Sequence, residues 1–431
     1  MLMPAAPRVE SRQRRALVAV LLCNVLEWYD FAVYGLLAVY LSRAFFPQDH
    51  SQVALLATLA VFGVSFVMRP LGGLLLGGMG DGRGRKPALL AAALLMAAST
   101  FAIGLIPSFE RIGLAAPLLL VAARMLQGFS AGGEFGVANA FLLETAPEGR
   151  RGFSTSFLSM TVALGSGLAS VSTALLVGLL PAAAMEHWGW RVPFLVGGLL
   201  GALALWLRRG IDETPAYERA APAPAAPEAV LQRVRRPMLT VFALTMHWTV
   251  CFYIFLIYLP LFTQKHAGLS AGEANWANAL STLAILIVVP LVGHLSDRVG
   301  RRPFLIASCG LVLVLALPAL WSITWLGSVL PDAFVPIAAI QFLLGCGIAL
   351  YSGAAPAVMV ELFATRDRSR WSAIAYALAA AVFGGFAPFI AVWLTTTLDW
   401  PLAPAGYVML ASAISLITAW RMPETAHRPL G

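Results

Sequence analysis

One short charged loop occurs twice in this chain, once in each half of the sequence. The segment GDGRGRKP begins at Gly80, and the segment SDRVGRRP begins at Ser296, in a chain of 431 residues. Each copy lies between two long apolar runs. A repeat at about half of the chain length indicates two related halves that are built from the same kind of unit.

The apolar runs dominate the composition. Hydrophobic residues make up 59% of the chain, charged residues make up 12%, and the mean hydropathy is +0.80. Soluble domains carry roughly 25% charged residues, so we predict a polytopic membrane protein. Runs of about 20 apolar residues are long enough to cross a bilayer as helices. The runs are continuous rather than alternating, which excludes a transmembrane barrel.

We therefore predict an all-α membrane protein with twelve transmembrane helices in two pseudo-symmetric six-helix bundles. Residues 1–210 would form the first bundle, residues 211–236 a cytoplasmic linker, and residues 237–431 the second bundle. The linker contains APAPAAPEA, a composition typical of an extended connection. The predicted spans are residues 16–44, 53–79, 88–106, 117–144, 154–180, 190–209, 238–263, 273–295, 304–328, 333–363, 371–397 and 402–420.

The positive charges predict the topology. Most Lys and Arg residues fall in segments that share one side of the membrane if the N-terminus is cytoplasmic. Arg43, Arg111, Arg191 and Lys265 fall on the other side. By the positive-inside rule, both termini are cytoplasmic. The net charge of +8 is then a topology signal, and no nucleic-acid partner is expected.

The cysteines and the N-terminus carry no other signal. Cys23, Cys251, Cys309 and Cys346 lie far apart inside apolar runs, without the spacing of metal ligands. Neither a metal site nor a cofactor is expected. The basic N-terminus precedes a long apolar run that contains acids, which indicates a first membrane helix rather than a cleaved signal.

Two acids lie inside the first predicted span. Glu27 and Asp30, in NVLEWYDF, are three residues apart and therefore share a helix face. A charge near the middle of a bilayer costs at least about 2.5–3.5 kcal/mol on insertion scales. A carboxyl group that can be neutral or charged there is what a proton carrier needs. The alternative is a structural pair that is neutralised by an arginine.

Three more charges lie inside predicted spans. Arg124 and Glu134 stand ten residues apart in ARMLQGFSAGGEFG and face broadly the same way. Because arginine stays charged, it must meet a carboxylate of the protein or of a substrate. Arg124 is the first candidate for contact with an anion or for tuning the proton-carrying acid. Arg69 would contact substrate or pair with Asp30 or Glu134.

Further substrate-binding candidates are polar and aromatic. Tyr and Trp often line sites that are partly polar and partly apolar, although they also simply pack. The segment HWTVCFYIFLIYLP concentrates such residues in one span. The candidates in this class are Tyr34, Tyr253, Tyr258 and Gln341.

The repeated loops predict gates. An acid at the end of one helix that pairs with arginines of a neighbouring helix in one conformation only acts as a latch between two states. The alternative is that these loops only anchor the topology. A phosphate-binding loop is excluded because the spacing G-x-x-x-x-G-K-[ST] is absent. The candidate gate residues are Asp81, Arg85, Glu144, Asp297, Arg301 and Glu361.

These motifs resemble a known family. The paired loops and RMLQGFSAGGE resemble the major facilitator superfamily. NVLEWYDFAVYG, FVMRPLGG, GLIPSFERIGLAAP, WGWRVPF and LRRGIDETPAYE resemble its bacterial metabolite–proton symporter branch, which includes permeases for proline and betaine, 2-oxoglutarate, citrate and shikimate. The resemblance implies alternating access and proton-coupled uptake across the inner membrane.

The resemblance also implies roles for single residues. Asp81 and Arg85 match the gating loop, Arg124 matches the arginine associated with proton coupling, and Glu27 and Asp30 match the acidic motif of the branch. Gly82 departs from the loop pattern, in which a basic residue is common, and this weakens the first latch.

The functional expectation is a transporter rather than an enzyme. We expect a monomer in the bacterial inner membrane that imports a small polar metabolite by proton symport. The buried arginines favour an organic acid with one, two or three carboxylates. A zwitterionic osmolyte such as proline or betaine ranks second, because aromatic rings bind cationic groups. Alternative functions of another type are those of an uncoupled facilitator, an exporter or a transporter-like receptor.

Overall fold

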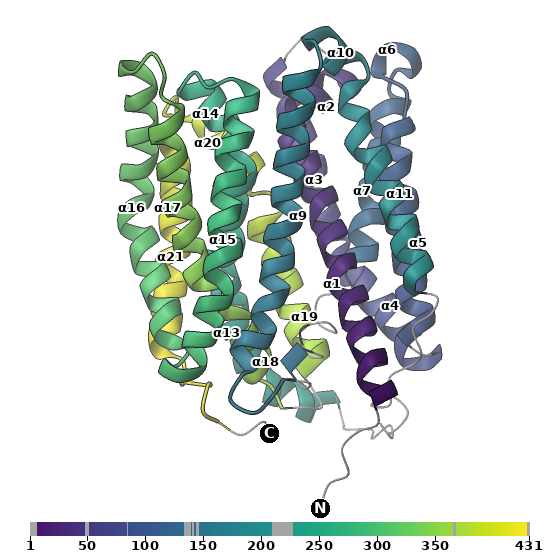
Figure 1. Cartoon of the computed structure of the whole chain (residues 1–431), viewed down its shortest axis with the longest axis vertical. Helices are drawn as coiled ribbons and strands as arrows, with labels where there is room; N and C mark the ends of the chain where they lie inside the picture. The colour runs from purple at the N-terminus through teal and green to yellow at the C-terminus, as the bar shows by residue number, and fades with distance from the viewer. Residues whose placement is uncertain are drawn as a thin grey trace, which may run out of the picture.

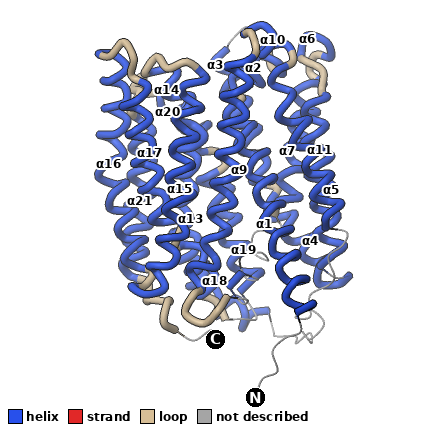
Figure 2. The backbone as a smooth tube through the Cα atoms, viewed as in Figure 1, coloured by secondary structure: helices blue, strands red, loops and turns tan. Residues whose placement is uncertain are grey.

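The apolar runs form long helices, because a bilayer offers no water to bond with the backbone and a helix satisfies its own polar groups. The computed structural model describes residues 7–47, 51–83, 85–132, 139, 142–143, 146–208, 227–364 and 368–428. This part of the chain is helical apart from short connections and contains no strand (Figure 2). We refer to residues 7–208 as the first half and to residues 227–428 as the second half.

The helices of the first half lie on one side of Figure 1. They are α1 (Pro7–Leu36), α2 (Ala38–Phe45), α3 (Ser51–Val67), α4 (Arg69–Arg83), α5 (Arg85–Leu105), α6 (Phe109–Ile112), α7 (Ala115–Ala131), α9 (Arg151–Leu179), α10 (Ala182–His187), the 3₁₀ turn η1 (Gly189–Arg191) and α11 (Val192–Arg208).

The helices of the second half include two π-helical segments. They are α13 (Pro227–Phe252), the π-helix η2 (Tyr253–Tyr258), α14 (Leu259–His266), α15 (Ala271–Val299), α16 (Arg302–Val329), α17 (Phe334–Ser352), α18 (Ala355–Glu361), α19 (Arg368–Ala379), the π-helix η3 (Ala380–Gly384), α20 (Ala387–Thr397) and α21 (Ala403–Arg421). The helix α13 begins inside the range that the sequence assigned to the linker.

Eight helices in the described part of the chain are long and apolar enough to cross a membrane, or nine if the bent pair α1 and α2 counts as one span. Two shorter apolar helices, Leu90–Leu105 and Ala115–Ala131, coincide with predicted spans. The protein is therefore a multi-pass membrane protein. The expected total of twelve spans stays a prediction, since the chain next to α7 and α11 lies outside the described residues.

The first predicted span is not one straight helix. α1 and α2 meet at an angle of 68°, with Leu37 between them outside the helical conformation. The bend lets Phe45 pack edge-on against Trp190, with the ring centroids 5.2 Å apart. The range predicted for this span, residues 16–44, thus contains a bend at Leu37 that the sequence analysis did not predict.

The halves meet along α9 and α15, which run side by side through the middle of Figure 1. Small residues allow this close approach. A Cβ added at Gly293 would lie 2.8 Å from the Gly152 carbonyl oxygen, and one at Gly167 would lie 2.8 Å from Thr282 Oγ1. Side-chain hydrogen bonds also cross the seam, since Asn278 Nδ2 donates to Ser170 Oγ at 2.8 Å.

Candidate functional site

Asp30 lies at one end of a buried chain of hydrogen bonds inside the first half. Thr100 on α5 donates its hydroxyl to Asp30 Oδ2 at 2.5 Å. Gln127 on α7 donates Nε2–H to Thr100 Oγ1 at 2.7 Å, and its Oε1 accepts from Arg124 Nη1 at 2.7 Å. Three helices thus connect Asp30 to Arg124 through two neutral side chains. The sequence analysis missed Thr100 and Gln127, although each is a polar residue in an apolar run.

Arg124 is fully buried and is held mainly by aromatic rings. Its guanidinium carbon lies 4.3 Å from the ring centroid of Tyr34 and 4.9 Å from that of Phe31. Nη2 donates to Ser65 Oγ at 3.2 Å. A desolvated guanidinium gains from the negative faces of aromatic rings. The rings and two hydrogen bonds hold Arg124 in this conformation, and its Nε has no hydrogen-bond partner.

The second oxygen of Asp30 faces a space left by a glycine. Asp30 Oδ1 is buried and has no hydrogen-bond partner. A Cβ added at Gly197 on α11 would lie 2.5 Å from this oxygen. An unpaired carboxylate oxygen in the interior costs free energy that a bound proton would relieve. The geometry at Asp30 therefore fits a site that gains and loses a proton.

Glu27 faces a different neighbour from Asp30. Arg69 Nη2 lies 3.5 Å from Glu27 Oε1, and both residues are buried. The Arg69 guanidinium lies 4.2 Å from the ring centroid of Phe66 and 5.6 Å from that of Trp28. The sequence left Asp30 and Glu134 open as partners of Arg69; the observed partner is Glu27, and a pairing with Glu134 stays untested. Asp30 turns toward α5, because a three-residue step rotates a helical side chain by about 60°, and Glu134 lies outside the described residues.

A small cavity lies where the two halves face each other. Its volume is about 20 Å³, room for roughly one water molecule. Five aromatic rings dominate its wall, and Ser352 accepts a hydrogen bond from Trp248 Nε1 at 2.9 Å. The lining residues are Trp28, Ser159, Val162, Trp248, Thr249, Phe252, Tyr253, Ile285, Ser352 and Tyr376. A metabolite needs more space than this cavity offers in this conformation.

Of the four polar and aromatic candidates for substrate binding, three lie apart from this cavity. Tyr253 lines it, and its hydroxyl has no hydrogen-bond partner. Tyr34 lies under Arg124 and donates to the Thr58 carbonyl at 3.1 Å. Tyr258 packs against Phe262, and the Gln341 amide is buried without a partner. Of the four candidates, the structure places Tyr253 in the wall of the central cavity.

The π-helix η2 follows from a proline. Pro260 has no N–H to donate to the Leu256 carbonyl, so the regular helical bond is lost. Asn278 on α15 donates Nδ2–H to that carbonyl at 2.9 Å instead. A single π-helical turn inside an α-helix is frequent at functional sites. Here the turn places Tyr253 at the central cavity.

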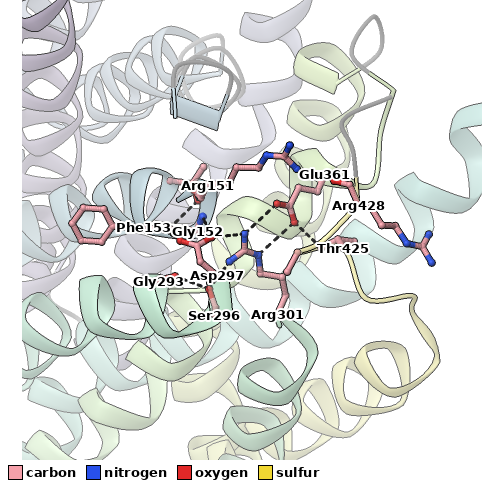
Figure 3. Close-up of polar contacts among 12 residues, drawn as sticks. Arg151, Gly152, Phe153, Gly293, Ser296, Asp297, Arg301, Glu361, Thr425 and Arg428 are labelled. Carbon is pink, nitrogen blue, oxygen red and sulfur yellow. Dashed lines mark hydrogen bonds and ion pairs between the residues drawn. The ribbon is translucent and has the colours of Figure 1, made fainter. Parts of the chain in front are cut away.

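At the end of the molecule where α1 begins and α21 ends, an ion-pair cluster joins the two halves (Figure 3). Arg301 Nη2 donates to Asp297 Oδ1 at 2.8 Å and to Glu361 Oε1 at 3.2 Å. The carboxylate of Asp297 also accepts from the backbone N–H groups of Gly152 at 2.8 Å and Phe153 at 2.9 Å. A carboxylate of the second half thus binds the N-terminus of α9 in the first half.

This arrangement corrects one part of the sequence-based expectation. Asp297 was expected to pair with arginines of a neighbouring helix, but its arginine partner, Arg301, follows it by four residues. The partner across the seam is the end of α9, where free N–H groups and the helix dipole favour an anion. Burial lowers the pKa of Arg301, but the carboxylates of Glu361 and Asp297 raise it by more than burial lowers it. The pKa of Arg301 is therefore raised.

The segment after α21 completes the cluster and was not predicted. Glu424 accepts from the backbone N–H groups of Arg301 at 2.9 Å and Arg302 at 3.0 Å, and Thr425 donates to Glu361 Oε2 at 2.6 Å. Burial raises the pKa of Glu424, but the four backbone N–H groups that it accepts from outweigh this and lower it. An acid just after the last apolar run was the only signal in the sequence.

The remaining candidates lie outside what the structure describes. Asp81 is a residue of α4 and Arg85 is the first residue of α5, but the side chains of both lie outside the described part of the structure. Glu134 and Glu144 lie outside it as well. The expected first-half latch therefore stays a prediction.

Comparisons with known proteins agree with this architecture. The family model described as sugar (and other) transporter matches residues 16–233, and that of the major facilitator superfamily matches residues 264–431. The chain is 34% identical to a proline/betaine transporter of Escherichia coli (strain K12), over 98% of this chain and 85% of the relative. It is also 34% identical to the alpha-ketoglutarate permease of the same strain, over 92% of this chain and 90% of the relative.

The fold matches solved transporters of low sequence identity. The xylose transporter of E. coli, in a partially occluded inward-open conformation, superposes with a TM-score of 0.75 at 17% identity, covering 97% of this chain and all of the other. Full-length agreement in sequence with two permeases and in fold with a third transporter leaves one assignment: the chain belongs to the major facilitator superfamily and, within it, to the metabolite–proton symporter family.

Proposed function

We propose that the protein imports a small zwitterion, such as proline or a betaine, together with protons. One observation carries the choice of substrate class, namely the aromatic lining of the cavity between the halves. Trp28, Trp248, Phe252, Tyr253 and Tyr376 surround it. Aromatic faces attract ammonium groups in a desolvated site. One relative of this chain, a proline/betaine transporter, supports the same class.

The charges next to the cavity support a zwitterion over a polyanion. Glu27 and Arg69 lie within 3.5 Å and together carry no net charge. A zwitterion can offer its carboxylate to Arg69 and its ammonium group to Glu27. A dicarboxylate would place uncompensated negative charge beside Glu27, which is costly where water is excluded.

An organic acid, which the sequence ranks first, becomes the second candidate. Arg124 is engaged with Gln127 and Ser65, away from the lining of the cavity. One observation still favours a carboxylate substrate: Arg69 Nε is buried without a hydrogen-bond partner, while Nη2 lies 3.5 Å from Glu27 Oε1. A guanidinium with an open donor suits a carboxylate ligand.

We assign proton coupling to Asp30. Its free oxygen would take the proton, and the chain through Thr100 and Gln127 would report the protonation state to Arg124. Proton entry supplies about 2.3 kcal/mol per 100 mV of membrane potential. With the termini cytoplasmic, protons and substrate would enter from the face opposite the one where α1 begins and α21 ends.

Alternating access would proceed by breaking one seam at a time. The cluster of Asp297, Arg301 and Glu361 would hold the cytoplasmic side closed. On the opposite side, a Cβ added at Gly35 would collide with Ile257, so these residues close the cavity there. Opening the cytoplasmic side requires Asp297 to release the N-terminus of α9.

The test is proton movement in proteoliposomes that contain an internal pH dye. L-proline, glycine betaine, 2-oxoglutarate and citrate are added outside, one at a time. Acidification with a zwitterion is expected. Acidification only with 2-oxoglutarate or citrate would reverse the order of the two candidates. Uptake of a labelled compound without proton movement would make the protein a facilitator. The absence of uptake for all four compounds would contradict the proposal.

A further inference from the structure

A second cavity lies between the halves, on the face opposite the cluster of Asp297. Its volume is about 280 Å³. Its walls come from the end of α1, α2 and α10 of the first half and from η2, α14 and α15 of the second half. The labels α10 and α14 mark this end of the molecule in Figure 1. We call this space the outer cavity.

The contact between Gly35 and Ile257 forms the floor of the outer cavity, and both residues line it. Tyr253, four residues before Ile257 on the same π-helix, lines the central cavity. One turn of η2 therefore separates the two cavities. A solute that enters from this face meets the outer cavity first.

The outer cavity contains one positive and one negative side chain at its rim. Arg43 donates to Glu186, and their side chains are 54% and 46% exposed. An exposed ion pair contributes little to stability, because water screens both charges. The pair can therefore separate and offer each charge to a ligand.

The deeper wall contains a hydrogen-bond acceptor without a partner. Asn275 is 2% exposed, its Nδ2 donates to the Ala271 carbonyl at 2.7 Å, and its Oδ1 has no hydrogen-bond partner. Gln264 likewise donates Nε2–H to the carbonyl four residues earlier, that of Pro260, at 2.9 Å. A buried acceptor without a donor is destabilising unless a ligand supplies one.

We propose that the outer cavity is a binding site for zwitterions whose ammonium group carries N–H donors, such as free amino acids. The carboxylate of the zwitterion binds Arg43, and the ammonium N–H groups bind Glu186 and Asn275 Oδ1. Trimethylated betaines have no N–H and leave Asn275 unpaired, so this site discriminates between two zwitterions that the central aromatic cavity accepts alike. The proposal rests on the proposed function, since a zwitterion must be the cargo.

The test measures how much ligand binds per chain and how fast it is transported. Purified protein in nanodiscs is titrated with radiolabelled L-proline and with radiolabelled glycine betaine. We expect two L-proline molecules but one glycine betaine per chain. Asn275→Leu should reduce L-proline to one per chain and raise its KM about tenfold, the effect of losing one hydrogen bond to a charged group. The kcat for L-proline and both constants for glycine betaine should stay unchanged.

Matched variants separate binding from folding. Glu186→Gln and Arg43→Gln, at the exposed rim, should also raise the KM for L-proline. Glu110→Gln and Arg111→Gln, at exposed residues of α6, should leave the KM unchanged. Asn275→Gln keeps an amide donor for the Ala271 carbonyl and an amide acceptor for the ligand, and should keep the second site even if the leucine variant fails to fold.

The outcomes distinguish this site from the proposed function. Transport of L-proline with one molecule bound per wild-type chain, and with the same KM in Glu186→Gln and Arg43→Gln, would overturn the outer site and leave the central proposal standing. If the protein neither binds nor transports L-proline and glycine betaine, the proposed function is overturned, and the outer site with it.

Discussion

The contact between Asp297 and α9 allows a quantitative prediction. In the Asp297→Asn variant the side chain keeps one acceptor oxygen and gains an NH₂ group. Two backbone donors of α9, at Gly152 and Phe153, face this position. One of them would then meet another donor instead of a carboxylate oxygen. The variant therefore removes a bond that exists only while the halves touch at this end.

The magnitude follows from which bonds change between the two states. The ion pair of Asp297 with Arg301 lies within the second half, so it survives when the halves separate and contributes nothing to the shift. The lost bond to the α9 backbone is charge-assisted, and the Asp297 side chain is only 4% exposed. Such a bond contributes about 1.5–3 kcal/mol. The equilibrium should move toward the cytoplasm-open state by roughly 10- to 150-fold.

The assay is a distance measurement between spin labels at positions 150 and 298, both of which are exposed. The labels are introduced in a variant without the four native cysteines. Wild-type protein should show mainly the short distance, and Asp297→Asn should populate a longer one. Glu273→Gln, at a half-buried acid of the capping box that begins α15, is the matched control, because glutamine can keep the capping hydrogen bond. An unchanged distance distribution in Asp297→Asn, with turnover also unchanged, would refute the latch.

Three further predictions concern separate contacts. Asp30→Asn should abolish accumulation driven by a pH gradient but keep substrate exchange in proteoliposomes; gradient-driven uptake at the wild-type level would remove Asp30 from coupling. Gly35→Ala should slow transport because the added methyl group collides with Ile257, at a cost of about 1–3 kcal/mol to the closed outer side; Ile257→Ala should restore the rate, and a failure to restore it would contradict the gate. In the folded protein the pKa of Glu424 lies below its ordinary value of 4.5. The ionised carboxylate therefore stabilises the fold above pH 4.5, and this effect is lost as the pH falls through the lower folded pKa. Glu424→Gln should reduce the melting temperature at pH 7 and reduce it less as the pH falls below 4.5, whereas an equal reduction at every pH would contradict this role.

The architecture was predictable because it depends on properties of single segments. Apolar runs of about 20 residues, separated by short charged loops, produce helices whatever their neighbours are. Helix α15 spans Ala271–Val299 where residues 273–295 were expected, and α16 spans Arg302–Val329 where residues 304–328 were expected. The break at Leu37 was not predicted, because LLAVYLS is apolar on both sides of it and a single preceding glycine, Gly35, is common inside membrane helices.

The site was predictable only as a set of charged residues. Glu27, Asp30, Arg69 and Arg124 stand out in the sequence because buried charges are costly in a membrane. Their pairing did not follow from this cost. Arg69 meets Glu27, and Asp30 reaches Arg124 only through Thr100 and Gln127, because the rotation of α1 against α4 and α5 sets which acid each helix meets.

The sequence by itself determined that this chain crosses a membrane and which family it resembles, and it predicts two related halves, because hydropathy, loop charge and short motifs are local properties. The tertiary structure alone decided that Asp297 binds the backbone of α9, that Glu424 binds the loop before α16, and that a cavity with an unpaired Asn275 oxygen lies between the halves. These contacts join residues that are more than a hundred positions apart or depend on backbone groups that every residue carries. No pattern along the chain can therefore mark them, and only the packing of the helices brings them together.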